Sequence, residues 1–246
     1  PNNNYEAVEY AGELVNLLER LNIPLTVFVQ TEVLERRPET VEQLRNSGVD
    51  VSFHPHSHTH SSRDHTSTKF EVKKSTQVFE NFFAEKPSGY RFPNGNIRSE
   101  DYRYLSQEGY KFDASVFPSW RPGHFNNSDS PTTPQYICPY DLVEIPFTVY
   151  SGTVRIPTAL SYCRLLGYPF TKLLTTSPPS TVIFNIHMHD LVNTSSFSEL
   201  SPMYKFIYSR NDSGFDILEK VLQEMQSQDY SFGTICSLYD RITDLR

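Results

Sequence analysis

The spacing of apolar residues along the chain predicts alternating helices and strands. From Glu6 to Leu21 apolar side chains recur every three or four residues, which gives a helix with one buried stripe. The short apolar segments LTVFVQ and VDVSF flank a second predicted helix, which follows Pro38, covers residues 39–46 and ends before Gly48. Two short buried strands separated by a helix are typical of parallel pairing, so the first third predicts a βα repeat.

The same alternation continues to the end of the chain. Further helices are predicted over residues 69–84, 99–108, 158–174 and 216–227, and further strands at SGYRFP, YKFDASV, LVEIPF, TVIFNIH and SFGTIC. Residues 120–139 are rich in Pro, Asn, Ser and Thr, and we interpret them as an irregular loop on the substrate side. Six or seven βα units without an evident linker predict a single α/β domain over residues 1–246, built as a barrel.

The composition is that of a folded protein with its own core. Of the 246 residues 37% are hydrophobic and 21% charged, no apolar stretch has the length of a membrane span, and the first residues lack the features of a signal peptide. Lys plus Arg number 22 and Asp plus Glu 29, and the resulting net charge of −7 argues against a nucleic-acid partner. The cellular compartment stays open.

The cysteines indicate neither a disulfide framework nor a thiolate zinc site. They number three, lie far apart and form no C-x-x-C pair. We therefore interpret Cys138, Cys163 and Cys236 as small core residues.

Histidines cluster directly after the predicted strand VDVSF. Five of the eight histidines of the chain lie in FHPHSHTHSSRDH. In a βα repeat this position is the carboxyl end of a strand, where active-site loops lie. His54 and His58 are four residues apart, as are His56 and His60, and a curled loop can turn such a pair toward one metal ion. The alternative is a solvated His-rich loop.

Polar residues also follow three other predicted strands. His187, His189 and Asp190 follow the apolar run TVIFN, while Arg91 lies in GYRFPNG and Asp113 in KFDASV. Side chains at different strand ends of a barrel converge at its mouth, and an arginine beside a carboxylate and a histidine commonly sets a general acid or base. The alternatives are a hydrogen-bonded core histidine and a surface salt bridge between Arg91 and Asp113.

Taken in order, these segments resemble the polysaccharide deacetylase family, the NodB-like carbohydrate esterases. The segment from NIPLTVFVQ to SFHPHSH resembles the run that ends in the metal-binding H-x-x-x-H motif of the family, which places His54 and His58 on the two ligand histidines. GYRFPNG resembles the R-x-P motif and supplies Arg91. The likeness extends from Glu6 to Leu238.

Two further segments resemble one subgroup of that family. GYKFDASVFP is similar to G-Y-x-Y-D-S-S-V-F-P, which places Asp113 on the acidic residue that supports the site. FNIHMHD is similar to F-Y-x-H-P-W-E, which places His187 on the catalytic histidine and Asp190 on the trailing acid, while Met188 and His189 depart from the motif.

The first motif of the family is absent from the sequence. That motif is a strand ending in T-F-D-D, whose first aspartate resembles a general base and whose second is the third metal ligand. The segment PNNNYEAVEYAG resembles the residues that follow it. We therefore expect a domain truncated at its amino terminus, without its first strand and with poor activity; the alternative is a natural variant that lacks the base.

The resemblance implies an irregular (β/α) barrel of about seven strands and a metal-dependent hydrolase that removes N-acetyl or O-acetyl groups from a carbohydrate or polysaccharide. A divalent ion, with zinc expected, would bind His54 and His58, polarise the acetyl carbonyl and activate water. His187 would protonate the departing amine, Arg91 would orient the base, and Asp113 would hold Arg91 or His187.

Two other functions stay open. One is an inactive carbohydrate-binding homologue that lacks the base, and the other is an amidohydrolase acting on a different small C–N substrate. The sequence leaves the sugar, the length of the acceptor and the oligomeric state undetermined.

Overall fold

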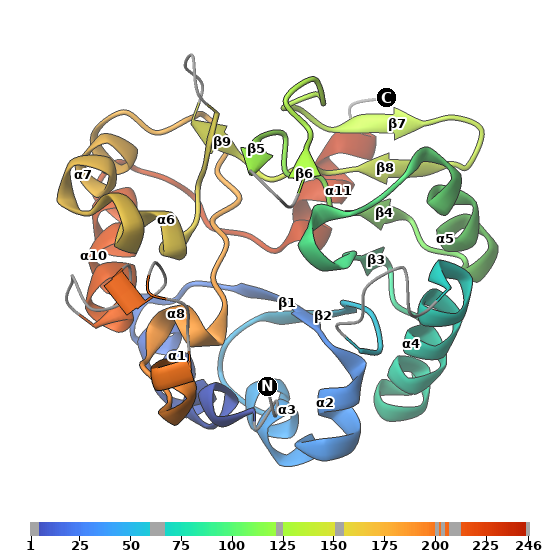
Figure 1. The fold of residues 1–246 in the computed structure, drawn as a ribbon, viewed down its shortest axis with the longest axis horizontal. Helices are drawn as coiled ribbons and strands as arrows, with labels where there is room; N and C mark the ends of the chain where they lie inside the picture. The colour runs from blue at the N-terminus through green and yellow to red at the C-terminus, as the bar shows by residue number, and fades with distance from the viewer. Residues whose placement is uncertain are drawn as a thin grey trace.

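The structure is a computed structural model that describes residues 5–59, 67–121, 125–150, 155–199, 202, 205–206 and 213–244 (Figure 1). Within these residues helices alternate with short strands, which confirms the α/β class. The helices between residues 11 and 108 lie along the outer side of the strands in the same part of the chain (Figure 1).

The first amphipathic segment forms two consecutive helices. A 3-10 helix, η1 (Glu6–Tyr10), leads directly into α1 (Ala11–Leu21). The predicted stripe is buried, with Leu14 and Leu18 in one apolar cluster. Asn22 adopts the left-handed conformation with a φ of 52°, and this ends the helix. The helix predicted from periodicity is thus confirmed.

The first two strands pair in parallel, as predicted. In this pair Leu25 lies opposite Val51 and Phe28 lies opposite His54. The structure adds α2, which was not predicted because six residues are too few to display a helical period. The elements of this unit are β1 (Leu25–Val29), α2 (Thr31–Arg36), α3 (Pro38–Arg45) and β2 (Val51–Pro55).

A four-stranded sheet lies next to the end of this first strand pair. Its strands, in spatial order, are β3 (Gly89–Tyr90), β4 (Phe112–Asp113), β8 (Leu142–Glu144) and β7 (Gln135–Ile137). The first three strands run parallel and β7 runs antiparallel to β8. Helices α4 (Thr68–Phe83) and α5 (Tyr102–Glu108) precede β3 and β4, as predicted. The backbone N–H of Arg91 donates to the carbonyl of Pro55 at 3.2 Å and thereby connects this sheet to the end of β2.

The rest of the chain contains two small antiparallel pairs and further helices. The pairs are β5 (Trp120–Arg121) with β6 (Phe125–Asn126), and β9 (Val149–Tyr150) with β10 (Ile156–Pro157). The helices are α6 (Leu160–Leu166), α7 (Tyr168–Thr176), α8 (Met188–Leu191), α10 (Gly214–Gln226) and α11 (Ile235–Asp244).

Three predictions of local structure are wrong. The segment TVIFNIH forms a single bridge, between Ala159 and Asn185, in place of a strand. The segment SFGTIC is not a strand, because α11 begins at Ile235. Residues 120–139 are not irregular throughout, since β5, β6 and β7 lie in this stretch. Over the residues that the structure describes, the paired strands belong to four separate sheets.

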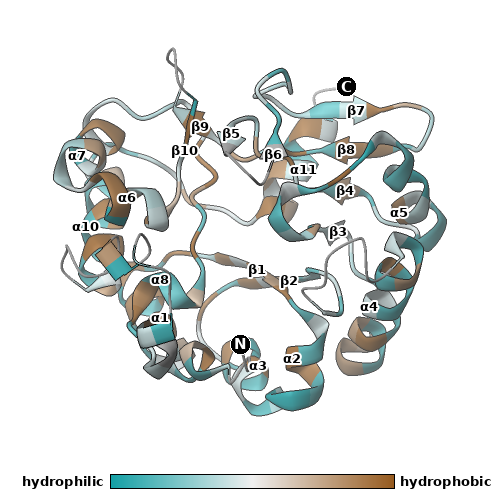
Figure 2. Cartoon of the chain, in the orientation of Figure 1, coloured by the Kyte–Doolittle hydropathy of each residue, from teal (hydrophilic) through white to brown (hydrophobic). Residues whose placement is uncertain are grey.

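Hydrophobic residues gather in the strands and on the helix sides that cover them (Figure 2). Helix α11 contributes to this core, because Ile235 packs with Phe112 and Val143 of the four-stranded sheet. None of the helices in the described ranges has the length and apolarity needed to span a membrane. Of the cysteines, Cys163 is buried as predicted, whereas Cys138 is exposed and Cys236 is half-buried.

Candidate active site

The candidate residues lie at the carboxyl ends of neighbouring parallel strands. Arg91 directly follows β3, Asp113 ends β4 and Glu144 ends β8. Because these three strands run parallel, their carboxyl ends lie at one edge of the sheet. His187 follows the bridge at Asn185 by two residues.

Arg91 joins the end of β4 to the segment that carries His187. Its Nε donates to the carbonyl of Ala114 at 2.9 Å, and its Nη1 donates to Oδ1 of Asn185 at 3.1 Å. The guanidinium carbon lies 4.0 Å from the ring centroid of Phe28 and 4.3 Å from that of Phe147. Burial lowers the pKa of Arg91 to about 9, and the carboxyl groups of the two strand ends oppose this shift. Asn185 was not singled out from the sequence, where it is an ordinary amide.

Asp113 forms a buried carboxyl pair with Glu144. The two residues lie opposite each other in the parallel register, and their carboxyl groups are hydrogen bonded. Burial is the main cause that raises the pKa of both groups, and the neighbouring Asp113 raises the pKa of Glu144 further. Glu144 was missed in the sequence, although one acidic residue inside the apolar run LVEIPF was an available signal.

A cavity borders this pair on the side of the 130–137 segment. Its volume is ≈ 320 Å³, and Glu144 and Tyr102 contribute to its wall together with Tyr136. Part of the stretch interpreted as a substrate-side loop, from Ser130 to Ile137, also lines it. The carboxyl pair therefore lies next to a space that faces this loop.

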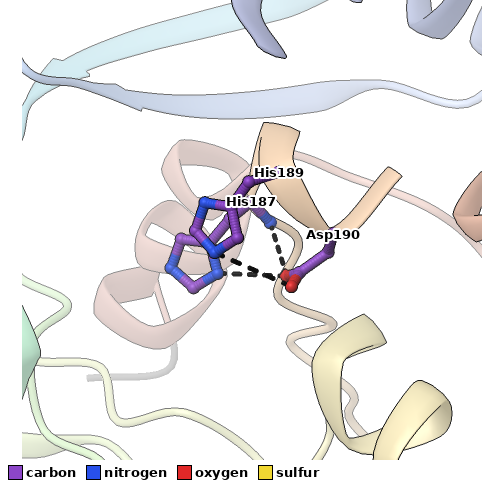
Figure 3. A group of neighbouring side chains, drawn as sticks. All are labelled: His187, His189 and Asp190. Carbon is purple, nitrogen blue, oxygen red and sulfur yellow. Dashed lines mark hydrogen bonds and ion pairs between the residues drawn. The ribbon is translucent and has the colours of Figure 1, made fainter. Parts of the chain in front are cut away.

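His187, His189 and Asp190 form a compact group at the start of α8 (Figure 3). Nδ1 of His187 lies 3.2 Å from Oδ2 of Asp190, and Nε2 of His189 lies 3.8 Å from Oδ1. The two imidazole rings stack with centroids 5.0 Å apart. Asp190 is fully buried, whereas 52% of the His187 side chain is exposed.

The backbone around Asp190 is held from two sides. Its carbonyl accepts a hydrogen bond of 2.7 Å from Nη1 of the buried Arg164. Gly214, the first residue of α10, packs against the same backbone, because a Cβ at this position would lie 2.0 Å from the Asp190 carbonyl oxygen and 2.6 Å from Cα of Leu191. These contacts fix the backbone that carries the carboxylate next to His187.

His54 lies inside the molecule between aromatic rings. It is 3% exposed, and its ring contacts Phe28 and Phe112 at centroid distances of 5.4 and 5.2 Å. The backbone N–H of Gly89 donates to Nδ1 at 3.3 Å, so the neutral ring carries its proton on Nε2, which lies 2.9 Å from Oγ of Ser52. Burial lowers the pKa of His54 to about 3, and the positive charge of Arg91 contributes to this shift. The ring is therefore neutral at physiological pH.

The ring of His58 has different neighbours. Its Nδ1 lies 3.0 Å from Oγ1 of Thr31, and its Nε2 lies 3.9 Å from Glu35, both on α2. Nδ1 of the intervening His56 bonds the carbonyl of Arg91 at 2.7 Å. The predicted ligands His54 and His58 thus contact separate parts of the fold, and their binding of one ion stays a prediction. His60 and His65, which we expected to face solvent, lie outside the described residues.

Among the residues that the structure describes, one group has the spacing for a metal ion. It consists of His187, His189 and Asp190, whose ligand atoms all lie within 4.8 Å of one another. Two imidazoles and a carboxylate are a suitable donor set for a divalent transition metal.

Comparison with known proteins assigns this architecture. Residues 3–112 match the polysaccharide deacetylase family, whereas none of the curated proteins matches the chain. The fold is similar to that of a probable polysaccharide deacetylase from Pseudomonas aeruginosa, with 13% identity, a TM-score of 0.59 and coverage of 96% of this chain and 74% of that chain.

Two further solved structures share the fold. A peptidoglycan deacetylase from Bacillus subtilis, solved as a mutant, has 12% identity, a TM-score of 0.55 and coverage of 97% of this chain and 86% of that chain. A carbohydrate esterase family 4 pseudoenzyme from Bacillus anthracis has 13% identity, a TM-score of 0.55 and coverage of 95% of this chain and 61% of that chain. Residues 3–112 thus match the polysaccharide deacetylase family, and the chain has the fold of these deacetylases.

Proposed function

We propose that the protein is a hydrolase that removes N-acetyl or O-acetyl groups from a carbohydrate, with a divalent metal ion, zinc, as its cofactor. The observation that carries the proposal is the position of Arg91, which bonds the segment after Asp113 and the segment before His187 at the same time. A cation, a carboxyl pair and a histidine with a buried carboxylate partner are the groups that acyl hydrolysis requires.

His187 is proposed as the residue that transfers the proton to the leaving group. Oδ2 of Asp190 accepts a hydrogen bond from the Nδ1–H of His187, so the carboxylate orients the ring and stabilises its protonated form. The half-exposed ring can reach a substrate bound at the carboxyl ends of the strands. Arg91 supplies positive charge beside the oxygen atom that becomes negative in the tetrahedral intermediate, and Asp113 holds that cation in place.

The metal ion implied by the family does not fit His54 and His58 as this structure arranges them. Nδ1 of His54 accepts from the Gly89 N–H, and Nε2 contacts Oγ of Ser52 and Sγ of Cys236, so both ring nitrogen atoms already have partners inside the fold. His187, His189 and Asp190 fit by spacing and donor type and would hold the ion, which would supply a Lewis acid for an acyl oxygen. A metal bond to His187 would compete with proton transfer by the same ring. Variants of His189 distinguish metal binding from proton transfer, because they remove a metal ligand and leave the His187 ring in place.

The arrangement of His54 favours one alternative, a carbohydrate-binding homologue without activity. A ring buried with both nitrogen atoms engaged is a structural residue in this form of the protein. This alternative predicts that an acetylated sugar oligomer binds and is released unchanged.

The test is release of acetate from an oligomer of N-acetylglucosamine, measured with and without zinc. We expect zinc-dependent turnover by the wild type, loss of turnover in His187→Ala, and lower turnover with a higher zinc requirement in the matched variant His189→Ala. Binding of the oligomer without acetate release would establish the binding homologue in place of the hydrolase. Equal acetate release by the wild type and His187→Ala would remove His187 from the reaction.

A further inference from the structure

Two acidic side chains lie side by side in the interior of the four-stranded sheet. Asp113 ends β4 and Glu144 ends β8, and the parallel register places them directly opposite each other. Asp113 is 0% exposed and Glu144 is 5% exposed. Two buried carboxylates at facing positions of paired strands are not expected to be ionised together, because their repulsion is not screened by water.

Each member of the pair accepts hydrogen bonds from neutral donors. Asp113 accepts from the backbone N–H of Ser115 at 3.0 Å and from its hydroxyl at 2.8 Å. Glu144 accepts from the backbone N–H of Val116 at 3.0 Å and from the Tyr102 hydroxyl at 3.0 Å. Each side chain thus accepts two hydrogen bonds from neutral donors, and burial raises the pKa of both groups.

The charge of the surroundings agrees with one negative charge on the pair. Arg91 is the cation whose electrostatic interaction reaches both carboxyl groups. Other titratable groups that face the pair are the phenols of Tyr90, Tyr102 and, across the cavity, Tyr136. One guanidinium opposite one shared negative charge leaves the buried cluster neutral, which a pair of carboxylates would not.

We propose that Asp113 and Glu144 share one proton and act as a single negative charge, with Glu144 as a positioning residue that holds Asp113 in place for Arg91. Glu144 keeps the proton and donates it in a hydrogen bond to Asp113, whose charge then faces the guanidinium. Because Arg91 also bonds Asn185, two residues before His187, Glu144 acts on the hydrolytic centre through Asp113 and Arg91. The part of this inference that concerns catalysis rests on the proposed function, whereas the shared proton does not.

The first test is independent of activity. The infrared spectrum of the protein without substrate at neutral pH is expected to contain the carbonyl band of a protonated carboxylic acid, which shifts in D₂O. The band should disappear in Glu144→Gln, where Asp113 is a simple carboxylate, and persist in Glu100→Gln, whose parent side chain is exposed. A wild-type spectrum without this band would overturn the proposal, whatever the protein hydrolyses.

The second test measures acetate release by the same variants. Glu144→Gln keeps a neutral donor opposite Asp113 and is expected to retain activity within about tenfold, since it alters one hydrogen bond with Tyr102. Glu144→Ala removes the donor, leaves the Asp113 charge without its partner and is expected to lose about 10²-fold in kcat with little change in KM. The double variant Glu144→Gln/Tyr102→Phe lacks the Tyr102 hydroxyl. It should therefore recover part of the activity that Glu144→Gln loses.

The outcomes separate the two proposals. If Glu144→Gln loses as much activity as Glu144→Ala while both fold, Glu144 acts as a charged group and the shared proton is excluded. If the infrared band is present but no variant, including the wild type, releases acetate, the proposed function fails and the proton-sharing pair stands. If Glu144→Ala does not fold, the infrared comparison of the wild type with Glu144→Gln still decides.

Discussion

Nη1 of Arg91 donates to Oδ1 of Asn185 at 3.1 Å, across 94 positions of the sequence. The same guanidinium bonds the Ala114 carbonyl through Nε, so one side chain fixes the distance between the end of β4 and the segment before His187. Phe28 and Phe147 cover the guanidinium group and exclude water from these bonds.

Arg91→Lys should therefore impair the protein although it keeps the charge. A lysine ammonium cannot bond both the Ala114 carbonyl and Asn185 in the fixed planar geometry of a guanidinium. We expect acetate release to fall about 10²-fold, in line with the loss of two charged hydrogen bonds of about 1.5 kcal/mol each. Steady-state kinetics check this value, with the exposed Arg103→Lys as the matched control. Unchanged kinetics in Arg91→Lys would show that the double contact is dispensable.

Asp190→Asn should lower kcat more than it raises KM. The amide can still accept from the His187 backbone N–H, but it no longer stabilises a protonated imidazole. A loss of about 10²-fold or more in kcat is expected for a residue that supports general acid catalysis. Steady-state measurement of kcat and KM checks this expectation, and an unchanged kcat in the variant would contradict it.

His54→Ala should destabilise the protein without any metal ion present. The ring packs against Phe28 and Phe112 and bonds Gly89 and Ser52, so truncation creates a cavity and leaves a buried N–H without its acceptor. We expect the free energy of unfolding in EDTA to fall by about 2 to 4 kcal/mol. His58→Ala, whose ring is nearer the surface, serves as the comparison and should lose about 1 kcal/mol. Equal, small effects that appear only with zinc would instead identify both residues as metal ligands.

The Asp113 and Glu144 pair should make stability depend on pH. The pKa of each group is raised in the folded state, so its contribution is fully present below the unfolded pKa of about 4 and is lost as pH rises through the folded value. Between these two values the free energy of unfolding should fall by about 1.4 kcal/mol per pH unit for the proton held by Glu144. Denaturant unfolding across this range should show a flatter curve for Glu144→Gln, and an identical slope in the variant would contradict the assignment.

Zinc should bind through His189 and not through His54. Titration calorimetry of the wild type is expected to show one site, and loss of one of three ligands in His189→Ala should weaken it by at least about tenfold. His54→Gln is the matched control, since its side chain is buried away from α8. Zinc affinity that disappears in His54→Gln and persists in His189→Ala would restore the pair that the family resemblance implies.

Periodicity predicted the helices well because each has its own buried stripe. The segments 6–21, 69–84 and 216–227 became helices at nearly the predicted positions, with Leu14 and Leu218 in one shared core cluster. The strands were less predictable, since β3 and β4 contain two residues each and are set by pairing between distant segments.

The site was predicted in part, and its remaining features depend on tertiary contacts. Arg91, Asp113 and His187 were singled out because each is a polar residue in or directly after an apolar run. This signal can be read from the sequence without knowledge of tertiary contacts. The burial of His54 could not be read from its spacing to His58, because the direction of its ring depends on Phe112 and Cys236, which lie far away in the sequence. Glu144 becomes significant only when β8 is placed beside β4.

Because Gly214 contacts the backbone of Asp190 and Leu191, this contact can form only after residue 214 has been synthesised. Residue 214 is synthesised 24 positions after Asp190, and the helix that clamps α8 continues to Gln226. A chain emerging from the ribosome therefore carries His187 and Asp190 before it carries the surface that holds them, so this part of the site matures late in synthesis. A nascent chain stalled before α10 would hold every candidate catalytic residue and still lack their final geometry.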